Sequence, residues 1–393
     1  MRHVDPIAEP DSELQVATGS RDRSRRVAMA AGGTAGHVTP ALAIADVYRK
    51  RVPDAEILFL GTAGGSEATL VPARGYPLHT LSAEPFFGVP WWRRGRALSA
   101  AFTGTLAARR WLRDEGVELL LSFGGYASAG AILGARSLGL PIIVHELNAL
   151  AGVTHRLLGP LADRVLLGFE SAGSAFRRDR ISWVGVPVSE RALAGRPAAP
   201  PAGRSMRVLV SGGTLGSNFL DEHVPELLAR VVARGCAVEV KHQVGRGDEA
   251  ATRARYAQAG VPSEVFHSTD DMIALLAWAD FAVVHGGAAT LAELAAMGVP
   301  ALVVPLGTAA LDHQAANARA FHQATGAGWT RERDWEPEPL ARGIAALAES
   351  PDAWLAAADG VRRAARPKAA LDVVEACEAL LREPGRSVAW AAR

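Results

Sequence analysis

Four glycine-rich stretches, each placed after a short apolar run, are the residues best suited to hold an anion in this 393-residue chain. Glycine permits a tight turn with exposed backbone N–H groups, and the start of a following helix attracts negative charge, so such turns can bind phosphate. A simple turn between a strand and a helix would use the same residues. The stretches are AAGGTAGHVTPALAIA (30–45), SFGGYASAG (122–130), SGGTLGSN (211–218) and HGGAATLAELAAMGVP (285–300).

The first stretch is neither GxGxxG nor GxxxxGK[ST], so it does not indicate a dinucleotide site or a P-loop. Within this stretch, His37 follows the glycines in the expected first helical turn, where an ordinary pKa of roughly 6.5 suits a general base. A capping or packing histidine is the alternative interpretation. Two Gly-rich turns that each follow the first strand of a domain predict two phosphorylated ligands across a cleft.

Glu293 is the candidate residue for ribose recognition. It comes early in the helix expected after the fourth stretch, and its carboxylate can accept hydrogen bonds from ribose hydroxyls. The backbone near Ala289 and Thr290 would offer N–H donors. A solvated helix glutamate is the alternative.

The elements that must position these residues alternate between short aliphatic runs and helical patterns. Several runs are apolar throughout, which is typical of parallel strands buried on both faces. Alternation of this kind predicts an α/β fold with helices on both sides of each sheet. The strands are expected within 26–31, 56–61, 119–123, 141–146, 164–169, 206–216, 237–245, 280–287 and 301–307.

The pattern restarts after a proline-rich stretch, so we expect two doubly wound, Rossmann-like parallel-sheet domains that face each other across a cleft. Ligands should bind where the carboxyl ends of both sets of strands meet. The predicted parts are a disordered leader (1–25), an N-terminal acceptor-binding domain (26–189), a linker (190–205), a C-terminal nucleotide-sugar-binding domain (206–383) and a tail (384–393).

Composition excludes several classes of protein. With 42 Lys and Arg against 41 Asp and Glu, no general basic field favours nucleic-acid binding. Cys236 and Cys377 are far apart and indicate neither a disulfide framework nor a metal site. The first 25 residues lack the apolar core of a signal peptide, and no run of about 18 uncharged apolar residues predicts a membrane span.

Together these stretches resemble the MurG-type glycosyltransferases of peptidoglycan synthesis. AGGTAGHVTPALAIA is similar to that family's GGTGGHxxPALA motif, and residues 122–158 resemble its second glycine loop and HExN segment. The resemblance covers roughly 26–380 and implies a GT-B fold. It also implies inverting transfer of N-acetylglucosamine from UDP-N-acetylglucosamine to the 4-hydroxyl of lipid-linked N-acetylmuramyl-pentapeptide, with no metal or other cofactor. The location implied is bacterial cytoplasm, peripheral on the inner membrane.

For the acceptor, the resemblance implies that His37 takes the proton from the attacking hydroxyl. His145, Glu146 and Asn148 match the HExN segment and would support the acceptor side. The residues implied to face the acceptor diphosphate are Gly32, Gly33, Thr34, Ala35, Gly36, Gly124, Gly125 and Tyr126.

For the donor, the resemblance implies that backbone N–H groups of the third stretch hold the pyrophosphate and that Glu293 holds the ribose. A DDM turn would lie near the uracil, and two polar residues would lie near the sugar. The implied donor residues are Gly212, Gly213, Thr214, Gly216, Thr269, Asp270, Asp271, Met272, Ala289, Thr290, Glu293, His313 and Gln314.

Departures from the family pattern fall mostly on the donor side. The family's GNPVR is GVPVS, its GGSQG is GGTLG, its RSGA is HGGA, and its paired glutamines are HQ. These changes leave the donor sugar open, because lost hydrogen bonds to a sugar alter discrimination strongly. The alternatives are a transferase of a specialised natural-product pathway, with another nucleotide sugar or a soluble acceptor, and a non-catalytic sugar-nucleotide-binding paralogue. The changed positions are Val186, Ser189, Leu215, His285, Gly286 and His313.

The segment PFFGVPWWRRGR (85–96) combines aromatic and basic side chains. With a lipid-linked acceptor, its aromatics are expected to enter the membrane interface while its arginines meet anionic head groups. Inward packing, or a sugar-stacking wall for a soluble acceptor, are the alternatives. The candidate membrane-contact residues are Phe86, Phe87, Trp91, Trp92, Arg93 and Arg94.

Overall fold

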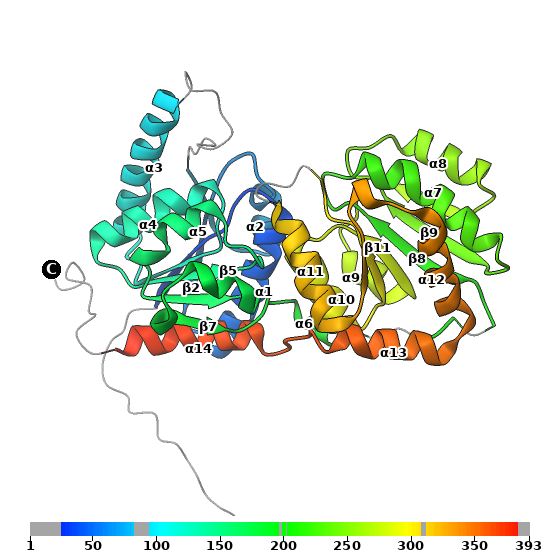
Figure 1. The fold of residues 1–393 in the computed structure, drawn as a ribbon. Helices are drawn as coiled ribbons and strands as arrows, with labels where there is room; N and C mark the ends of the chain where they lie inside the picture. The colour runs from blue at the N-terminus through cyan, green and yellow to red at the C-terminus, as the bar shows by residue number, and fades with distance from the viewer. Residues whose placement is uncertain (1–24, 82–93, 196–198, 202, 308–311, 384–393) are drawn as a thin grey trace, which may run out of the picture.

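The computed structural model describes residues 25–81, 94–195, 199–201, 203–307 and 312–383. Two wholly parallel sheets lie side by side, each covered by helices on both faces, which confirms the predicted fold class (Figure 1). Most of the inner strands are short aliphatic runs that are almost completely buried, as parallel strands between helical layers must be, whereas the edge strands are partly exposed.

The N-terminal sheet has seven strands in the order β3-β2-β1-β4-β5-β6-β7. Two apolar clusters, one on each face, form its core. The strands are β1 (Arg26–Ala30), β2 (Glu56–Gly61), β3 (Leu78–Thr80), β4 (Leu119–Ser122), β5 (Ile142–Glu146), β6 (Arg164–Leu167) and β7 (Ile181–Trp183).

The C-terminal sheet has six strands in the order β10-β9-β8-β11-β12-β13. It too is enclosed by two apolar clusters. The strands are β8 (Met206–Ser211), β9 (Val238–Gln243), β10 (Ser263–Phe266), β11 (Phe281–Val284), β12 (Ala301–Val303) and β13 (Gly328–Trp329).

Fourteen α-helices are present in the part of the chain that the structure describes. Several begin at a side chain that accepts a hydrogen bond from the first turn, for example Ser217 before α7 and Asp248 before α8. The helices are α1 (Ala35–Arg51), α2 (Glu67–Ala73), α3 (Arg94–Asp114), α4 (Tyr126–Leu138), α5 (Val153–Leu158), α6 (Glu190–Leu193), α7 (Asn218–Val232), α8 (Glu249–Gln258), α9 (Met272–Trp278), α10 (Ala288–Met297), α11 (His313–Thr325), α12 (Pro337–Glu349), α13 (Pro351–Arg362) and α14 (Ala369–Arg382).

The strand order places the four glycine stretches in two pairs. β1 lies beside β4, with Ala30 opposite Ser122, and β8 lies beside β11, with Ser211 opposite Val284. These are the points where the strand order reverses in each sheet. Because ligands of doubly wound sheets bind at such switch points, each domain has its two glycine loops at its expected ligand site.

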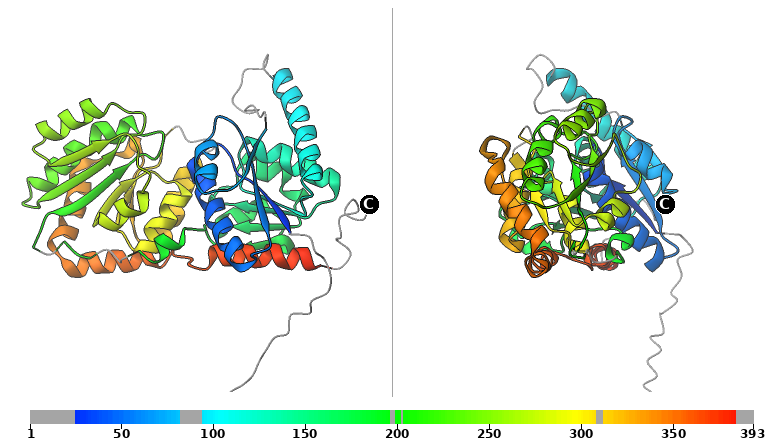
Figure 2. Two further views of the ribbon diagram at one scale, coloured as in Figure 1. Left: turned by 180° about the vertical axis from the view of Figure 1, so that it is seen from behind. Right: turned by 90° about the vertical axis from the view of Figure 1, so that its right-hand side faces the viewer.

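The last helix returns to the first domain. α13 lies under the C-terminal sheet, and α14 runs beneath the N-terminal sheet against α1 (Figures 1 and 2). Val373, Cys377 and Leu380 join the same apolar cluster as Tyr48. The predicted C-terminal domain, 206–383, therefore includes a helix that packs on the other sheet.

The predicted tail and all of the predicted leader except Arg25 lie outside the described residues. No helix within the described ranges has the length and apolar character needed to cross a membrane.

Candidate active site

The two glycine loops of the N-terminal domain touch each other. Gly125 has a φ of 82°, and a Cβ at this position would lie 2.5 Å from the carbonyl oxygen of Gly32. Both the backbone conformation and the close approach therefore require glycine. The contact joins the loop after β1 to the loop after β4.

Glu67, at the start of α2, holds the first loop in place. Its fully buried carboxylate accepts hydrogen bonds from the Gly33 N–H (2.9 Å) and from the Thr62 N–H and hydroxyl (both 2.7 Å). Since the Gly33 N–H is engaged, the first N–H groups of α1, at Ala35 and Gly36, are the better donors for an anion. Glu67 was not among the predicted residues.

His37 lies in the first turn of α1 and is half-buried. Burial lowers its pKa below 6.5, and the negative charge of Glu146 opposes that shift only in part. Its Nδ1 is buried and has no hydrogen-bond partner in the described part of the chain. A neutral imidazole of this kind can accept a proton near neutrality. The charge of His313 also lowers the pKa of His37, so the two histidines interact across the cleft.

The HExN side chains form a buried layer beneath the loops. His145 Nε2 donates to the Gly185 carbonyl oxygen at 3.0 Å, and burial lowers its pKa to about 4. Burial alone would raise the pKa of Glu146. Hydrogen bonds from His155 and from the N–H groups of Asn148 and Gly152 outweigh it and hold that pKa at about 2. Glu146 therefore links the loop after β5 to His155, whose ring lies beside Gly124 of the second glycine loop.

The first loop of the C-terminal domain, after β8, also has a position that only glycine can occupy. Gly216 has a φ of 78°, and a Cβ there would lie 1.9 Å from the Val244 carbonyl oxygen. Ser211 Oγ accepts from the Gly213 N–H at 3.1 Å. No hydrogen bond within the described ranges engages the N–H groups of Thr214 and Leu215, so these are available to a phosphate.

The second loop of this domain leads into α10. Ala289 and Thr290 lie in its first turn, where backbone N–H groups have no partner within the helix. Glu293 follows one turn later and is partly exposed, and no described residue pairs with it. Burial raises its pKa to about 7. A carboxylate in this position can accept hydrogen bonds from a ligand's hydroxyls.

The DDM turn is a helix start. Asp271 Oδ1 accepts from the Ala274 N–H at 2.9 Å and so caps α9, while the Thr269 hydroxyl accepts from the Asp271 N–H at 3.0 Å. Arg191 Nη2 donates to Asp271 Oδ2 at 2.6 Å. Asp270 is exposed beside this cap, and Met272 begins α9.

The predicted sugar residues His313 and Gln314 begin α11, at the edge of the cleft. Gln314 Oε1 accepts from the Leu306 N–H at 3.0 Å. His285 is buried, and its Nδ1 donates to the Val304 carbonyl oxygen at 2.7 Å. Its Nε2 is buried without a partner in the described chain, and burial lowers its pKa.

Three further positions differ from the family pattern, and the structure shows what surrounds each of them. Val186 is buried in the apolar core, and Ser189 Oγ caps α6 by accepting from the Ala192 N–H at 3.2 Å. Leu215 is 54% exposed on the first donor loop. Of these three changes, two therefore serve the fold, and only Leu215 presents its side chain to solvent, on the glycine loop after β8.

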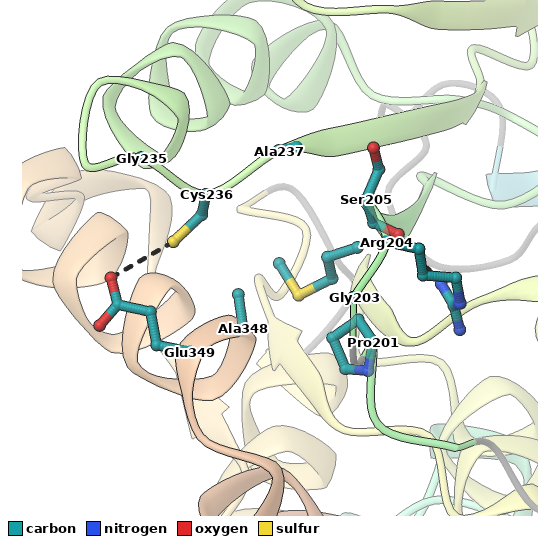
Figure 3. A pocket seen from close by; sticks show the side chains of 10 residues that line it. Pro201, Gly203, Arg204, Ser205, Gly235, Cys236, Ala237, Ala348 and Glu349 are labelled. Carbon is teal, nitrogen blue, oxygen red and sulfur yellow. Dashed lines mark hydrogen bonds between the residues drawn. The ribbon is translucent and has the colours of Figure 1, made fainter.

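A separate cavity of about 530 Å³ lies at the other end of the C-terminal sheet (Figure 3). It is lined by Met206, the first residue of β8, and by Cys236, whose Sγ lies 3.5 Å from Glu349 Oε1. The glycine loop follows Ser211, the last residue of β8. This cavity therefore does not belong to the candidate active site.

Five of the predicted membrane-contact residues lie outside the described residues: Phe86, Phe87, Trp91, Trp92 and Arg93. Arg94 begins α3, and Tyr126 begins α4, but the side chains of both lie outside the described part of the structure.

Among the described residues, no three His, Cys, Asp or Glu side chains gather as a group that could hold a metal ion.

Two doubly wound domains whose paired glycine loops face a common cleft form the GT-B architecture. Family models of the glycosyltransferase family 28 N-terminal and C-terminal domains match residues 27–167 and 207–372. A UDP-N-acetylglucosamine--N-acetylmuramyl-(pentapeptide) pyrophosphoryl-undecaprenol N-acetylglucosamine transferase of Acidithiobacillus ferrooxidans is 41% identical over 355 residues, which cover 89% of this chain and 96% of the relative. The chain belongs to glycosyltransferase family 28, among the MurG-type enzymes.

Solved structures agree with this assignment. MurG of Acinetobacter baumannii is similar with a TM-score of 0.72 and 28% identity, covering 90% of this chain and 99% of that one. The glycosyltransferase of kitacinnamycin has a TM-score of 0.69 at 20% identity, over 91% of this chain and 100% of that one. At that identity the second similarity shows the fold alone.

Proposed function

We propose that this chain transfers N-acetylglucosamine from UDP-N-acetylglucosamine to the 4-hydroxyl of lipid-linked N-acetylmuramyl-pentapeptide, with inversion at the anomeric carbon. The substrates follow from the name of the relative at 41% identity. The observation that carries the reaction type is the placement of neutral, half-buried His37 in the N-terminal domain and of Glu293, which has no partner among the described residues, in the C-terminal domain.

In this mechanism, His37 removes the proton from the acceptor hydroxyl. The hydroxyl oxygen then bonds to the anomeric carbon while the bond from that carbon to the donor diphosphate breaks, and the electron pair leaves with UDP. Glu146 lies close enough for its charge to favour the imidazolium that results. The starts of α7 and α10, with the free N–H groups of Thr214 and Leu215, would stabilise the departing diphosphate without a metal or other cofactor.

Mass spectrometry of products tests this proposal. The purified protein is given UDP-N-acetylglucosamine and a short-chain lipid analogue of the muramyl-pentapeptide, beside His37→Ala. A disaccharide product that falls by about 100-fold or more in His37→Ala is expected. No product, with transfer from another nucleotide sugar in a donor panel, would contradict it. Exposed Leu215 and the unpartnered Nε2 of His285 favour a specialised-pathway transferase as the second candidate.

A lipid-linked acceptor requires the enzyme to reach a membrane surface, so we also propose peripheral binding to the cytoplasmic face of the inner membrane. α3 projects from the N-terminal domain (Figure 1), and its Phe102 and Leu106 are 66% and 50% exposed. These residues are one helical turn apart and lie on the same face of α3, which follows the aromatic and basic segment.

Sedimentation with anionic phosphatidylglycerol vesicles tests this surface. We expect the double change Phe102→Ser and Leu106→Ser to weaken vesicle binding about tenfold, because it removes apolar area from the interface. Leu355→Ser is the matched control, since Leu355 is 43% exposed on α13 of the other domain. Equal loss in both variants, or no loss in the double variant, would contradict docking through α3.

A further inference from the structure

Asn317 on α11 is a fully buried amide that contacts both domains. Its Oδ1 accepts from the Ala149 N–H at 2.7 Å, in the loop after β5. Its Nδ2 donates to Asn148 Oδ1 at 3.1 Å and to the Gly286 carbonyl oxygen at 2.9 Å. Both hydrogens of the amide are therefore used, one toward each domain.

On the N-terminal side, Asn148 continues the chain of hydrogen bonds inward. Its Nδ2 lies 3.3 Å from Glu146 Oε1, which also accepts from the Asn148 N–H at 2.9 Å. The second carboxylate oxygen of Glu146 accepts from His155 Nδ1 at 2.9 Å and from the Gly152 N–H at 3.0 Å. The loop that meets Asn317 is thus fixed to the buried hydrogen bond between Glu146 and His155.

His155 in turn contacts the second acceptor loop. Ser122 Oγ, at the end of β4, lies 3.2 Å from His155 Nε2. A Cβ on Gly124 would lie 3.5 Å from the His155 ring, so this loop rests directly on the imidazole. His155 therefore lies beside the loop whose next residue, Gly125, touches Gly32.

On the C-terminal side, Gly286 lies between His285 and the start of α10. A Cβ on Gly286 would lie 2.3 Å from the Gln314 carbonyl oxygen, so the donor loop packs tightly on the first turn of α11. Figures 1 and 2 show α11, in yellow, standing between the two sheets. The residue that reaches into the N-terminal domain is therefore on the helix that abuts the donor loop.

We propose that Asn317 is a positioning residue that aligns the acceptor loops with the donor loop through the series Ser122, His155, Glu146, Asn148, Asn317 and Gly286. Group transfer needs the reacting atoms at roughly 3–3.5 Å, so the two loops must keep a fixed separation. Asn317 supplies this alignment without touching substrate. The inference concerns the cleft itself and rests on the proposed function only for its kinetic readout.

Two substitutions separate the contacts of Asn317. Asn317→Ala removes all three hydrogen bonds. Asn317→Asp keeps an acceptor for the Ala149 N–H but places an oxygen against Asn148 Oδ1 and the Gly286 carbonyl oxygen, where hydrogen bonds become repulsions. Gln323→Ala is the matched control, because Gln323 is exposed on the same helix.

Amide hydrogen exchange with and without UDP is the first test, and it needs neither acceptor nor turnover. In the unaltered protein, UDP is expected to slow exchange in residues 146–155 on the order of fivefold, a typical coupling between sites. In both Asn317 variants, UDP should slow exchange only in the C-terminal domain. The proposal is overturned if UDP still slows exchange in residues 146–155 of the variants. It is also overturned if UDP does not slow exchange there in the unaltered protein.

Kinetics with the transfer assay is the second test. We expect kcat to fall about 10-fold to 100-fold in both Asn317 variants, while the Kd of UDP changes by less than about threefold. Gln323→Ala should change neither. A fall in UDP affinity equal to the fall in kcat would mean that Asn317 supports only the donor loop. If the unaltered protein forms no product, the proposed function fails, and the exchange experiment still decides the role of Asn317.

Discussion

Burial shifts the pKa values of the two residues assigned to proton removal and ribose binding in opposite directions. His37 is neutral near pH 7 because burial disfavours the imidazolium. We therefore expect the acid limb of the pH profile of kcat/KM to lie below pH 6.5, since a lowered pKa keeps the base active to lower pH. The measurement is kcat/KM from pH 5 to 8. An acid limb above pH 7 would mean that another group is the base.

Glu293 is subject to the opposite effect, because burial raises its pKa to about 7. An ionised carboxylate accepts ribose hydroxyls more strongly than a protonated one, so donor affinity should rise as pH increases from 6 to 8. Glu293→Gln should abolish this rise and weaken binding about tenfold at pH 8. Calorimetry with UDP-N-acetylglucosamine suits the test because its diphosphate carries no proton that titrates in this range. An unchanged slope in Glu293→Gln would contradict the assignment.

At the scale of elements, α2 fixes the first glycine loop through one side chain. Glu67→Gln would place an NH₂ group opposite the Gly33 or Thr62 N–H, where the carboxylate now accepts. A buried donor without an acceptor costs about 1–3 kcal/mol, so the free energy of unfolding should fall by that amount. The acceptor KM should rise while UDP affinity stays the same.

Urea unfolding and the two binding constants check this prediction. Glu375→Gln, on the exposed face of α14, is the control and should leave stability and KM unchanged. A Glu67→Gln variant with unaltered stability and acceptor KM would show that the loop does not depend on α2.

The sequence predicts the long elements well because their signal is local. All nine expected strands form, and the resemblance to the family places His37 and Glu293 on opposite sides of the cleft. The strands it misses are two to four residues long and lie at or next to the sheet edges: β3, β7, β10 and β13. Short strands of this kind carry no continuous apolar run.

The buried polar contacts were not predicted for a different reason. Asn317 and Ala149 are 168 positions apart, and Glu67 meets Gly33 across 34 positions. Nothing in the local pattern of an asparagine or a glutamate distinguishes a buried hydrogen-bonding side chain from a solvated one. Only the arrangement of the two sheets brings these partners together, so this part of the site requires the three-dimensional structure.

At the scale of the whole molecule, α14 makes the chain's last helix part of its first domain. Glu378 on this helix accepts hydrogen bonds from Tyr48 and Arg25, and its pairing with Arg25 ties the first described residue to the last helix. Together with the 190–205 connection, the chain therefore crosses between the domains twice. Such a double connection restricts how the two ligand sites can move relative to each other.

This topology predicts which domain a change in α14 destabilises. Leu380 is 1% exposed in the N-terminal core, so Leu380→Ala should reduce the stability of that domain by about 2–5 kcal/mol. UDP stabilises the domain that binds it, and so marks the C-terminal transition in thermal unfolding. We expect Leu380→Ala to lower the transition that UDP shifts least. Leu355→Ala should lower neither transition, because the Leu355 side chain on α13 is 43% exposed. If Leu380→Ala lowers only the UDP-shifted transition, then α14 is energetically part of the donor domain, and the acceptor domain is stable without it.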